Sequence, residues 1–97
     1  MTAFKDLEFK ELPDGSGIYC RIQFENGFGA SIVNHKYSYG GKDGLYELAV
    51  LGSDEEIHYD NTVSNGDVLG YLSENDVEIH LKEIKSLEPN ETENNIH

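Results

Sequence analysis

The clearest hydrophobic pattern in the chain lies between Ile18 and Phe24. Apolar side chains occupy every second position there, with Cys20 and Ile22 between the two ends, and mostly polar side chains fill the alternate positions. Such alternation is typical of a β-strand with one buried face and one solvated face. The proline, aspartate and glycines just before this segment favour a turn. The pattern therefore predicts a strand that begins after a turn.

The Glu-Asn-Gly segment that follows this strand predicts a hairpin, and the apolar pattern distinguishes two registers. A two-residue Asn-Gly turn would place Phe28 and Ile32 on the solvated face. A three-residue loop, with Gly27 in the left-handed bulge position, instead pairs Phe24 with Phe28 and Cys20 with Ile32. We therefore predict the three-residue loop.

The longest apolar run, Leu45–Leu51, predicts a strand covered on both faces at the middle of the sheet. The polar residues that follow predict a turn, after which Ile57–Tyr59 can return as an antiparallel strand. Near the N-terminus, Leu7–Leu12 fits a further short strand, and a helical turn within Phe4–Leu12 is the alternative. These segments together predict an antiparallel meander of four or five strands.

Two helical signals follow the predicted meander. Ser64 lies three residues before Asp67, in the spacing of a capping box, and predicts a short helical turn through Leu69 and Leu72. Ser73 gives a stronger start for a second helix, because an acidic residue again follows at the third helical position.

This second helix is predicted to span residues 74–87, with Val77, Leu81 and Ile84 on one apolar stripe that packs across the sheet. Pro89 then ends it. The fold class is therefore α+β: a four- to five-stranded antiparallel meander with a C-terminal helix packed on one face. Residues 1–88 are predicted to form one domain, and residues 89–97 a disordered acidic tail.

The charge distribution restricts the class of partner. The 97 residues carry a formal net charge of -12, and no lysine or arginine occurs between Lys42 and Lys82. This excess of negative charge repels nucleic acid and anionic membranes, and it attracts basic protein surfaces. The single cysteine, Cys20, excludes an intramolecular disulfide and is predicted to be a buried thiol.

No stretch approaches the ~20 apolar residues that a membrane-spanning helix needs. The N-terminus lacks the basic and then apolar layout of a signal peptide. The sequence therefore predicts a cytoplasmic protein.

Five strings occur in order along the chain: NGFGASIV at 26–33, YSYG at 37–40, GLYELAVL at 44–51, YD at 59–60 and DVLGYLSENDV at 67–77. They resemble a family of small uncharacterised bacteriophage proteins. The resemblance implies a phage gene expressed inside a bacterial host cell. It implies no catalytic residues that could be carried over to this chain.

The segment that joins two of the predicted strands is the first candidate binding site. It contains Tyr37, Tyr39, Gly40, Gly41 and Lys42. The tyrosines offer stacking area, the glycines allow close approach of a backbone, and the lysine adds positive charge. The alternative interpretation is that the tyrosines cover the end of the sheet while the glycines form turns. The segment lacks the spacing of a phosphate-binding loop.

Acidic side chains form the second candidate site. We expect Asp54, Glu55, Glu56, Glu74 and Glu78 to contact a basic partner surface through electrostatic complementarity. The alternative interpretation is a solvated surface that keeps a small protein soluble.

No catalytic, metal or cofactor motif is present. His58 and Asp60 would share one face of a strand and His80 borders the helical stripe, but no ligand spacing supports a metal. No Ser-His-Asp arrangement can be placed from the sequence. We predict a non-enzymatic protein that needs no cofactor or metal.

The sequence therefore predicts an acidic phage accessory protein that binds and modulates a bacterial host protein, such as a nucleic-acid-handling or anti-phage defence factor. Direct nucleic-acid and membrane binding are not expected, whereas the edges of the sheet allow a homodimer. Two alternatives remain open. One is a protein that binds or sequesters a nucleotide through the tyrosine-glycine segment, and the other is a minor virion or assembly component.

Overall fold

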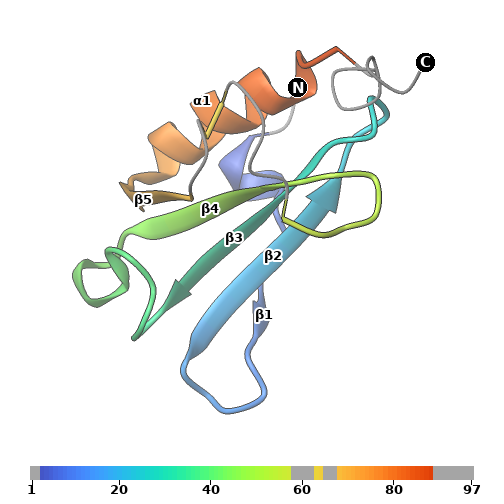
Figure 1. Ribbon diagram of the computed structural model, residues 1–97. Coiled ribbons are helices and arrows are strands. Elements are labelled where there is room, and N and C mark those ends of the chain that lie inside the picture. Colours follow the sequence, from blue (N-terminus) through green and yellow to red (C-terminus); the bar gives the residue numbers. More distant parts are fainter. Residues whose placement is uncertain (1–2, 58–62, 65–67, 89–97) are drawn as a thin grey trace.

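The fold is a five-stranded antiparallel sheet with one α-helix packed on one face (Figure 1). The computed structural model describes residues 3–57, 63–64 and 68–88. The strands follow the order β1-β2-β3-β4-β5, so each strand pairs with its neighbour along the chain. The predicted α+β class and the predicted meander with a C-terminal helix are confirmed. The predicted tail, residues 89–97, lies outside the described residues.

The elements have the following bounds. The strands are β1 (Lys10–Glu11), β2 (Gly17–Gln23), β3 (Gly29–His35), β4 (Tyr46–Leu51) and β5 (Leu69–Leu72), and the helix is α1 (Glu74–Lys85). Two short 3-10 turns, η1 (Phe4–Asp6) and η2 (Gly41–Asp43), complete the described structure. Of the helices in the described residues, none combines the length and apolar content needed to span a bilayer.

The β2–β3 hairpin has the predicted three-residue loop. Gly27 lies in the left-handed region with φ 90°, and the Phe24 N–H donates to the Phe28 carbonyl at 2.7 Å. Cys20 pairs with Ile32, as the apolar pattern required. The three-residue loop therefore places the alternating apolar residues of β2 and of β3 on the same face of the hairpin, which is the buried face.

The Asn26 side chain connects this hairpin to the helix. Its amide nitrogen donates to the carbonyl oxygens of Ile84, Lys85 and Leu87 at 2.8, 3.2 and 3.0 Å. Its amide oxygen accepts from the Phe28 N–H at 3.0 Å. The last carbonyls of a helix lack partners within the helix. Asn26 therefore satisfies the C-terminal end of α1 while it holds the hairpin loop in shape.

The helix begins where the capping box predicted. The Ser73 hydroxyl accepts from the Asp76 N–H, and the Asp76 carboxylate accepts from the Ser73 N–H, both at 3.1 Å. The predicted stripe of Val77, Leu81 and Ile84 is completely buried. The helix ends at Lys85, two residues before the predicted end, because the chain there closes into a turn capped by the hairpin.

Strand β4 is covered on both faces, as predicted. Leu48 and Val50 join the core beneath the helix, and the alternate residues Ala49 and Leu51 are also buried. The prediction that this strand is the middle of the sheet is wrong, because β5 pairs on its far side and leaves β3 as the central strand.

The helical turn predicted after Ser64 is wrong, because Leu69–Leu72 forms strand β5. Leu72 is buried and lies opposite Tyr46 across the β4–β5 ladder. Burial of Leu72 against the helix favours the extended form over a short local turn. Ile57 forms an isolated antiparallel bridge with Leu51, and residues 58–59 of the predicted returning strand lie outside the described residues.

The N-terminal strand is shorter than the predicted Leu7–Leu12. The chain leaves the sheet edge before Lys10, because Phe4 and Phe9 pack instead on Tyr46 at the mouth of the core. The ring centroids of Phe4 and Phe9 lie 5.1 and 5.8 Å from that of Tyr46. Aromatic burial therefore competes with pairing along the edge of β2 and limits β1 to two residues.

Removing the Asn26 amide tests its role in joining the two layers. We expect Asn26→Ala to lower the free energy of unfolding by about 1–3 kcal/mol, because two helix carbonyls, the Leu87 carbonyl and one N–H lose their partner. Urea denaturation followed by circular dichroism measures this change. The neighbouring variant Glu25→Ala, at an exposed position, is the control and should change stability by less than about 0.5 kcal/mol. Equal effects of the two variants would contradict the capping role.

The capping box gives the fold a defined acid dependence. Hydrogen bonds from the Ser73 backbone and side chain lower the pKa of Asp76 below its ordinary value of 3.8. A lowered folded-state pKa stabilises the fold above the unfolded-state pKa, and this stabilisation is lost as the pH falls through the folded-state value. We expect Asp76→Asn to lower the melting temperature at neutral pH and to differ less from the wild type in strong acid. A constant difference across the acid range would count against this linkage.

Candidate functional site

Local hydrogen bonds and glycine conformations determine the path of the loop between β3 and β4. The Ser38 hydroxyl accepts from the His35 N–H and donates to the His35 carbonyl, at 3.0 and 2.9 Å. Gly40 and Gly44 have φ values of 89° and 75°, a conformation that favours glycine. A Cβ at Gly41 would lie 1.9 Å from the His35 carbonyl oxygen. These glycines are therefore required by the path of the loop, as the turn-forming interpretation proposed.

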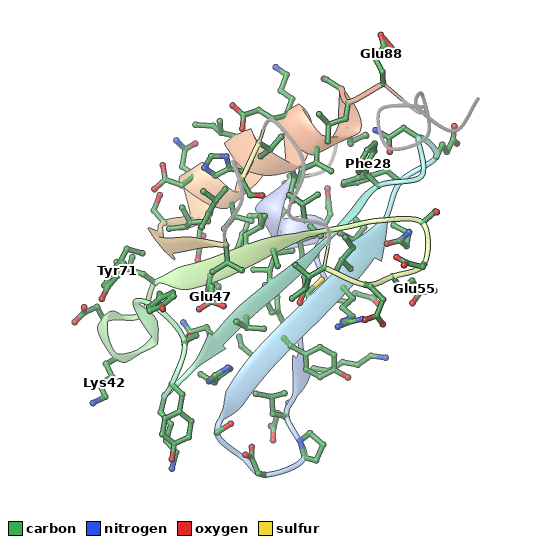
Figure 2. All side chains as sticks on the ribbon, viewed as in Figure 1. Phe28, Lys42, Glu47, Glu55, Tyr71 and Glu88 are labelled. Carbon is green, nitrogen blue, oxygen red and sulfur yellow. The ribbon has the colours of Figure 1, made fainter. Side chains whose placement is uncertain are left out.

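The same loop is fastened to both β4 and β5. The Tyr39 N–H donates to the Glu47 carboxylate at 2.8 Å, and the Tyr39 carbonyl accepts from the Tyr71 N–H at 3.2 Å. A Cβ at Gly70 would lie 2.5 Å from the Tyr39 Cβ, so the glycine allows the two segments to meet. Figure 2 shows Tyr71, Glu47 and Lys42 at this end of the sheet. The position of Tyr39 is therefore fixed by partners from two strands.

Tyr71 holds an unusual backbone conformation. Its φ is 57°, in the left-handed region, which costs a residue with a Cβ roughly 1–2 kcal/mol. Its side chain is nevertheless 62% exposed, so burial of the ring does not offset this cost. Strained backbone clusters at functional sites. Tyr71 was not among the predicted site residues, because its one local signal in the sequence is a large aromatic residue next to Gly70.

Three exposed aromatic side chains project from this end of the sheet. Tyr37 is 77% exposed, Tyr39 is 59% exposed and Tyr71 is 62% exposed, and we call these three residues the tyrosine surface. The Lys36 ammonium lies 5.2 Å from the centre of the Tyr37 ring. The Tyr37 N–H donates to His35 Nδ1 at 3.1 Å. Tyr37 and Tyr39 therefore present much of their rings to solvent, while the Tyr39 side chain also lies against Gly70 of β5.

A hollow of about 260 Å³ lies between this loop and β5. Lys36, Lys42 and Asp43 line it together with Tyr71, so it combines charged side chains of both signs with an aromatic ring. The predicted loop residues Gly40 and Lys42 both belong to its lining.

The acidic residues that follow β4 form a tight turn. The Glu56 N–H donates to the Asp54 carboxylate at 3.0 Å, and Glu55 has a φ of 65°. The Arg21 guanidinium donates to the Glu55 carbonyl at 3.2 Å. All three acidic residues are exposed. The Asp54 carboxylate therefore stabilises the turn, whereas those of Glu55 and Glu56 project from it.

Glu74 and Glu78 lie in the first two turns of α1. The Glu78 carboxylate accepts a hydrogen bond from the Phe4 N–H and so fixes the N-terminal segment to the helix. Burial of the Tyr46 hydroxyl raises its pKa, and the negative charge of Glu74 adds a smaller effect in the same direction. Of these two predicted contact residues, Glu78 has a structural hydrogen bond and Glu74 is exposed.

The predicted site residues therefore occupy three places. The loop residues lie at one end of β4 and the residues 54–56 at its other end, which six residues of strand separate by roughly 17–20 Å. Glu74 and Glu78 lie on the helix. One small contact surface therefore cannot include all of the predicted site residues. The tyrosine surface lies at the end of β4 that carries the β3–β4 loop.

The remaining candidate groups offer no further chemistry among the residues that the structure describes. No group of three or more histidine, cysteine, aspartate or glutamate side chains is placed there to hold a metal. His80 instead contacts Glu83, with 2.8 Å between Nδ1 and Oε1, and His58 and Asp60 lie outside the described residues. Cys20 is buried, as predicted, and burial raises the pKa of its thiol.

Comparisons with protein families, with curated proteins and with solved structures find no match to this chain.

The strain at Tyr71 can be tested by removing its side chain. We expect Tyr71→Gly to leave the free energy of unfolding within about 1 kcal/mol of the wild type, because glycine adopts positive φ without steric cost. Leu72→Ala, at the adjacent buried position, should cost about 2–5 kcal/mol. Urea denaturation of the two variants provides the comparison. A large loss in Tyr71→Gly would show that the ring supports the fold.

Proposed function

We propose that this protein is a non-enzymatic acidic binding protein whose tyrosine surface contacts a partner protein. The observation that carries the proposal is the set of three exposed rings, Tyr37, Tyr39 and Tyr71, on a loop and a strand fixed to each other. Tyrosine is enriched among the residues that contribute most to protein interfaces. It offers a large contact area with few rotatable bonds, so little conformational entropy is lost on binding.

The fixed loop supports binding by a preformed surface. Hydrogen bonds from Tyr39 to Glu47 and from Tyr71 to Tyr39 hold both backbones before any partner arrives. Preorganisation of this kind reduces the ordering cost of association. The left-handed Tyr71 contributes an exposed ring at the expense of local stability, as expected for a contact residue.

The net charge of -12 supports a partner with a basic surface. Its long-range field raises the association rate with such a partner, and this effect weakens with salt. Asp54, Glu55 and Glu56 lie at the far end of β4, beyond the screening length of about 8 Å at physiological salt. In this proposal they contribute to approach, while the tyrosine surface makes the contact.

The partner in this proposal is a bacterial host protein, and the setting is the cytoplasm of a host cell. This part rests on the resemblance to small bacteriophage proteins. Modulation of a nucleic-acid-handling or anti-phage defence factor fits an acidic protein of this kind, because such factors present basic clefts.

The test is capture of partners from bacterial lysate by three forms of the protein. The first is the wild type, the second carries Tyr37→Ala, Tyr39→Ala and Tyr71→Gly, and the third carries Asp54→Lys, Glu55→Lys and Glu56→Lys. We expect the tyrosine variant to lose the captured protein at every salt concentration, because its contact side chains are gone. The charge variant should capture less of it than the wild type at low salt, and this difference should shrink as added salt screens the charges. Retention of the captured protein by the tyrosine variant would refute the proposed contact surface.

The hollow beside the tyrosine surface favours a second candidate function, which is binding of a nucleotide. Lys36 and Lys42 would pair with phosphate and Tyr71 would stack on a base. A thermal-shift screen with nucleotides tests it. Stabilisation that disappears in Lys42→Ala but persists in the charge variant would favour this function over protein binding.

A further inference from the structure

We propose that the uncovered edge of β2, from Cys20 to Gln23, accepts an extended basic segment of a partner protein as an additional strand. This second binding surface is distinct from the tyrosine surface, because β2 and β5 lie toward opposite edges of the sheet. The proposal does not rest on the proposed function.

The register of the β2–β3 hairpin determines which backbone groups face outward. The Phe24 N–H donates to the Phe28 carbonyl, so Phe24 and Ile22 direct their backbone groups toward β3. In an antiparallel pair these roles alternate along the strand. The N–H and C=O groups of Arg21 and Gln23 therefore face away from β3, at the edge of the sheet.

Strand β1 covers only the first part of this edge. Lys10 and Glu11 pair with Tyr19 and Ile18, and in the described part of the chain no strand pairs with the rest of β2 on this side. The N-terminal chain turns away toward the helix through η1 (Phe4–Asp6), so the edge beyond Tyr19 is left open. Four backbone hydrogen-bonding groups, two each on Arg21 and Gln23, are thus available to an added strand.

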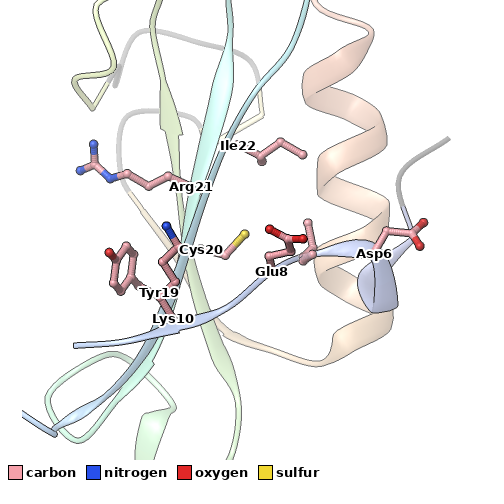
Figure 3. Close-up of a pocket in the computed structure, with 8 residues that line it drawn as sticks. Asp6, Glu8, Lys10, Tyr19, Cys20, Arg21 and Ile22 are labelled. Carbon is pink, nitrogen blue, oxygen red and sulfur yellow. The ribbon is translucent and has the colours of Figure 1, made fainter. Parts of the chain in front are cut away.

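Two hollows follow the open edge. The first, of about 330 Å³, lies between residues 6–8 and β2, and Figure 3 shows Cys20 and Ile22 directed into it while Arg21 and Tyr19 point to the other side. The second, of about 560 Å³, is lined by Gln23–Asn26 and Lys85. Strand addition uses main-chain hydrogen bonds for affinity and such hollows for alternate side chains.

The apolar side chains along the edge and the net charge of the whole chain indicate the occupant. Ile22 and Phe24 are half-buried apolar side chains that an apolar residue of the added strand would cover. Figure 3 shows the Glu8 carboxylate facing the first hollow, and among the described residues Glu8 forms no salt bridge. The Arg21 guanidinium is directed instead to the Glu55 carbonyl. Lys10 and Arg21 also line the first hollow, and Lys85 lines the second. The basic character of the occupant therefore follows from the net charge of -12, which attracts a segment that alternates apolar and basic residues and repels a second copy of this chain.

The opposite edge of the sheet does not offer the same surface. In β5 the ladder is irregular between Tyr46 and Leu48 of its partner, and Tyr71 has a φ of 57°. The Tyr71 N–H already donates to the Tyr39 carbonyl. Bulges and irregular backbone of this kind prevent edge pairing. The regular, open edge of the sheet is therefore that of β2.

A labelled seven-residue peptide of alternating lysine and valine is a suitable probe. We expect saturable binding by fluorescence anisotropy that weakens with salt. In amide exchange measured by NMR, the peptide should slow exchange at Arg21 and Gln23 but not at Tyr71. Gln23→Pro removes an outward-facing N–H without removing a hydrogen bond to β3, so it should weaken binding by about tenfold. Gln23→Ala, which keeps this N–H, and Tyr71→Gly should bind as the wild type.

Four results would overturn the proposal. They are the absence of binding, equal binding by Gln23→Pro, equal binding of a peptide methylated on alternate backbone nitrogens, and a dimer of this chain that excludes the peptide. The methylated peptide keeps its charge and side chains but lacks the backbone N–H donors that strand pairing needs. It therefore tests the proposal even if Gln23→Pro does not fold. Because Tyr71→Gly serves as a control here, failure of the strand-addition proposal and failure of the tyrosine surface are distinguishable.

Discussion

The side chain of Asn26 makes the two layers of the molecule one structure. Four hydrogen bonds from one amide group satisfy the C-terminal end of α1 and fix the loop between β2 and β3. The register of this hairpin decides which side chains of β2 and β3 face the helix, and the helix position decides how deeply they are buried. The buried cluster that includes Phe28, Leu81 and Ile84 therefore depends on a polar residue at its border. A hydrophobic core alone would not specify the angle at which the helix crosses the sheet.

The parts of the fold that the sequence predicted are those determined locally. Alternation along β2, the left-handed glycine of the hairpin and the reciprocal Ser73–Asp76 cap each depend on residues close together in the chain. Strand β5 was not predicted, because Leu69 and Leu72 are spaced as on a helix and their extended form depends on pairing with Tyr46 and Leu48. The short β1 likewise depends on the packing of Phe4 and Phe9 on Tyr46, a contact between distant segments. Tertiary context determined the outcome in both cases.

The residues of the candidate site likewise include some that the sequence predicted and others that depend on contacts between distant segments. The exposure of Tyr37 and Tyr39 follows from their place in a glycine-containing loop, which the sequence identified. Tyr71 could not be predicted, because its exposure depends on a left-handed backbone and on the contact of Gly70 with Tyr39. The acidic residues were predicted to form one surface, but the number of acidic residues does not determine which of them lie together in the fold. The sheet separates residues 54–56 from the tyrosines, and the Glu78 carboxylate accepts a hydrogen bond from the N-terminal backbone.

The hydrogen bonds between Asn26 and the helix also bear on how the protein folds. The sheet is a meander, so its strands pair with neighbours in the chain and can form through short loops at little entropic cost. The bonds from Asn26 instead join residues 58 to 61 positions apart, and the bond from Phe4 to Glu78 spans 74. Docking of α1 is therefore expected to be a late step in folding. Val77, Leu81 and Ile84 of the helix are completely buried against β3 and β4. Release of α1 would therefore expose the whole core, so the helix and the central strands should open together in global unfolding.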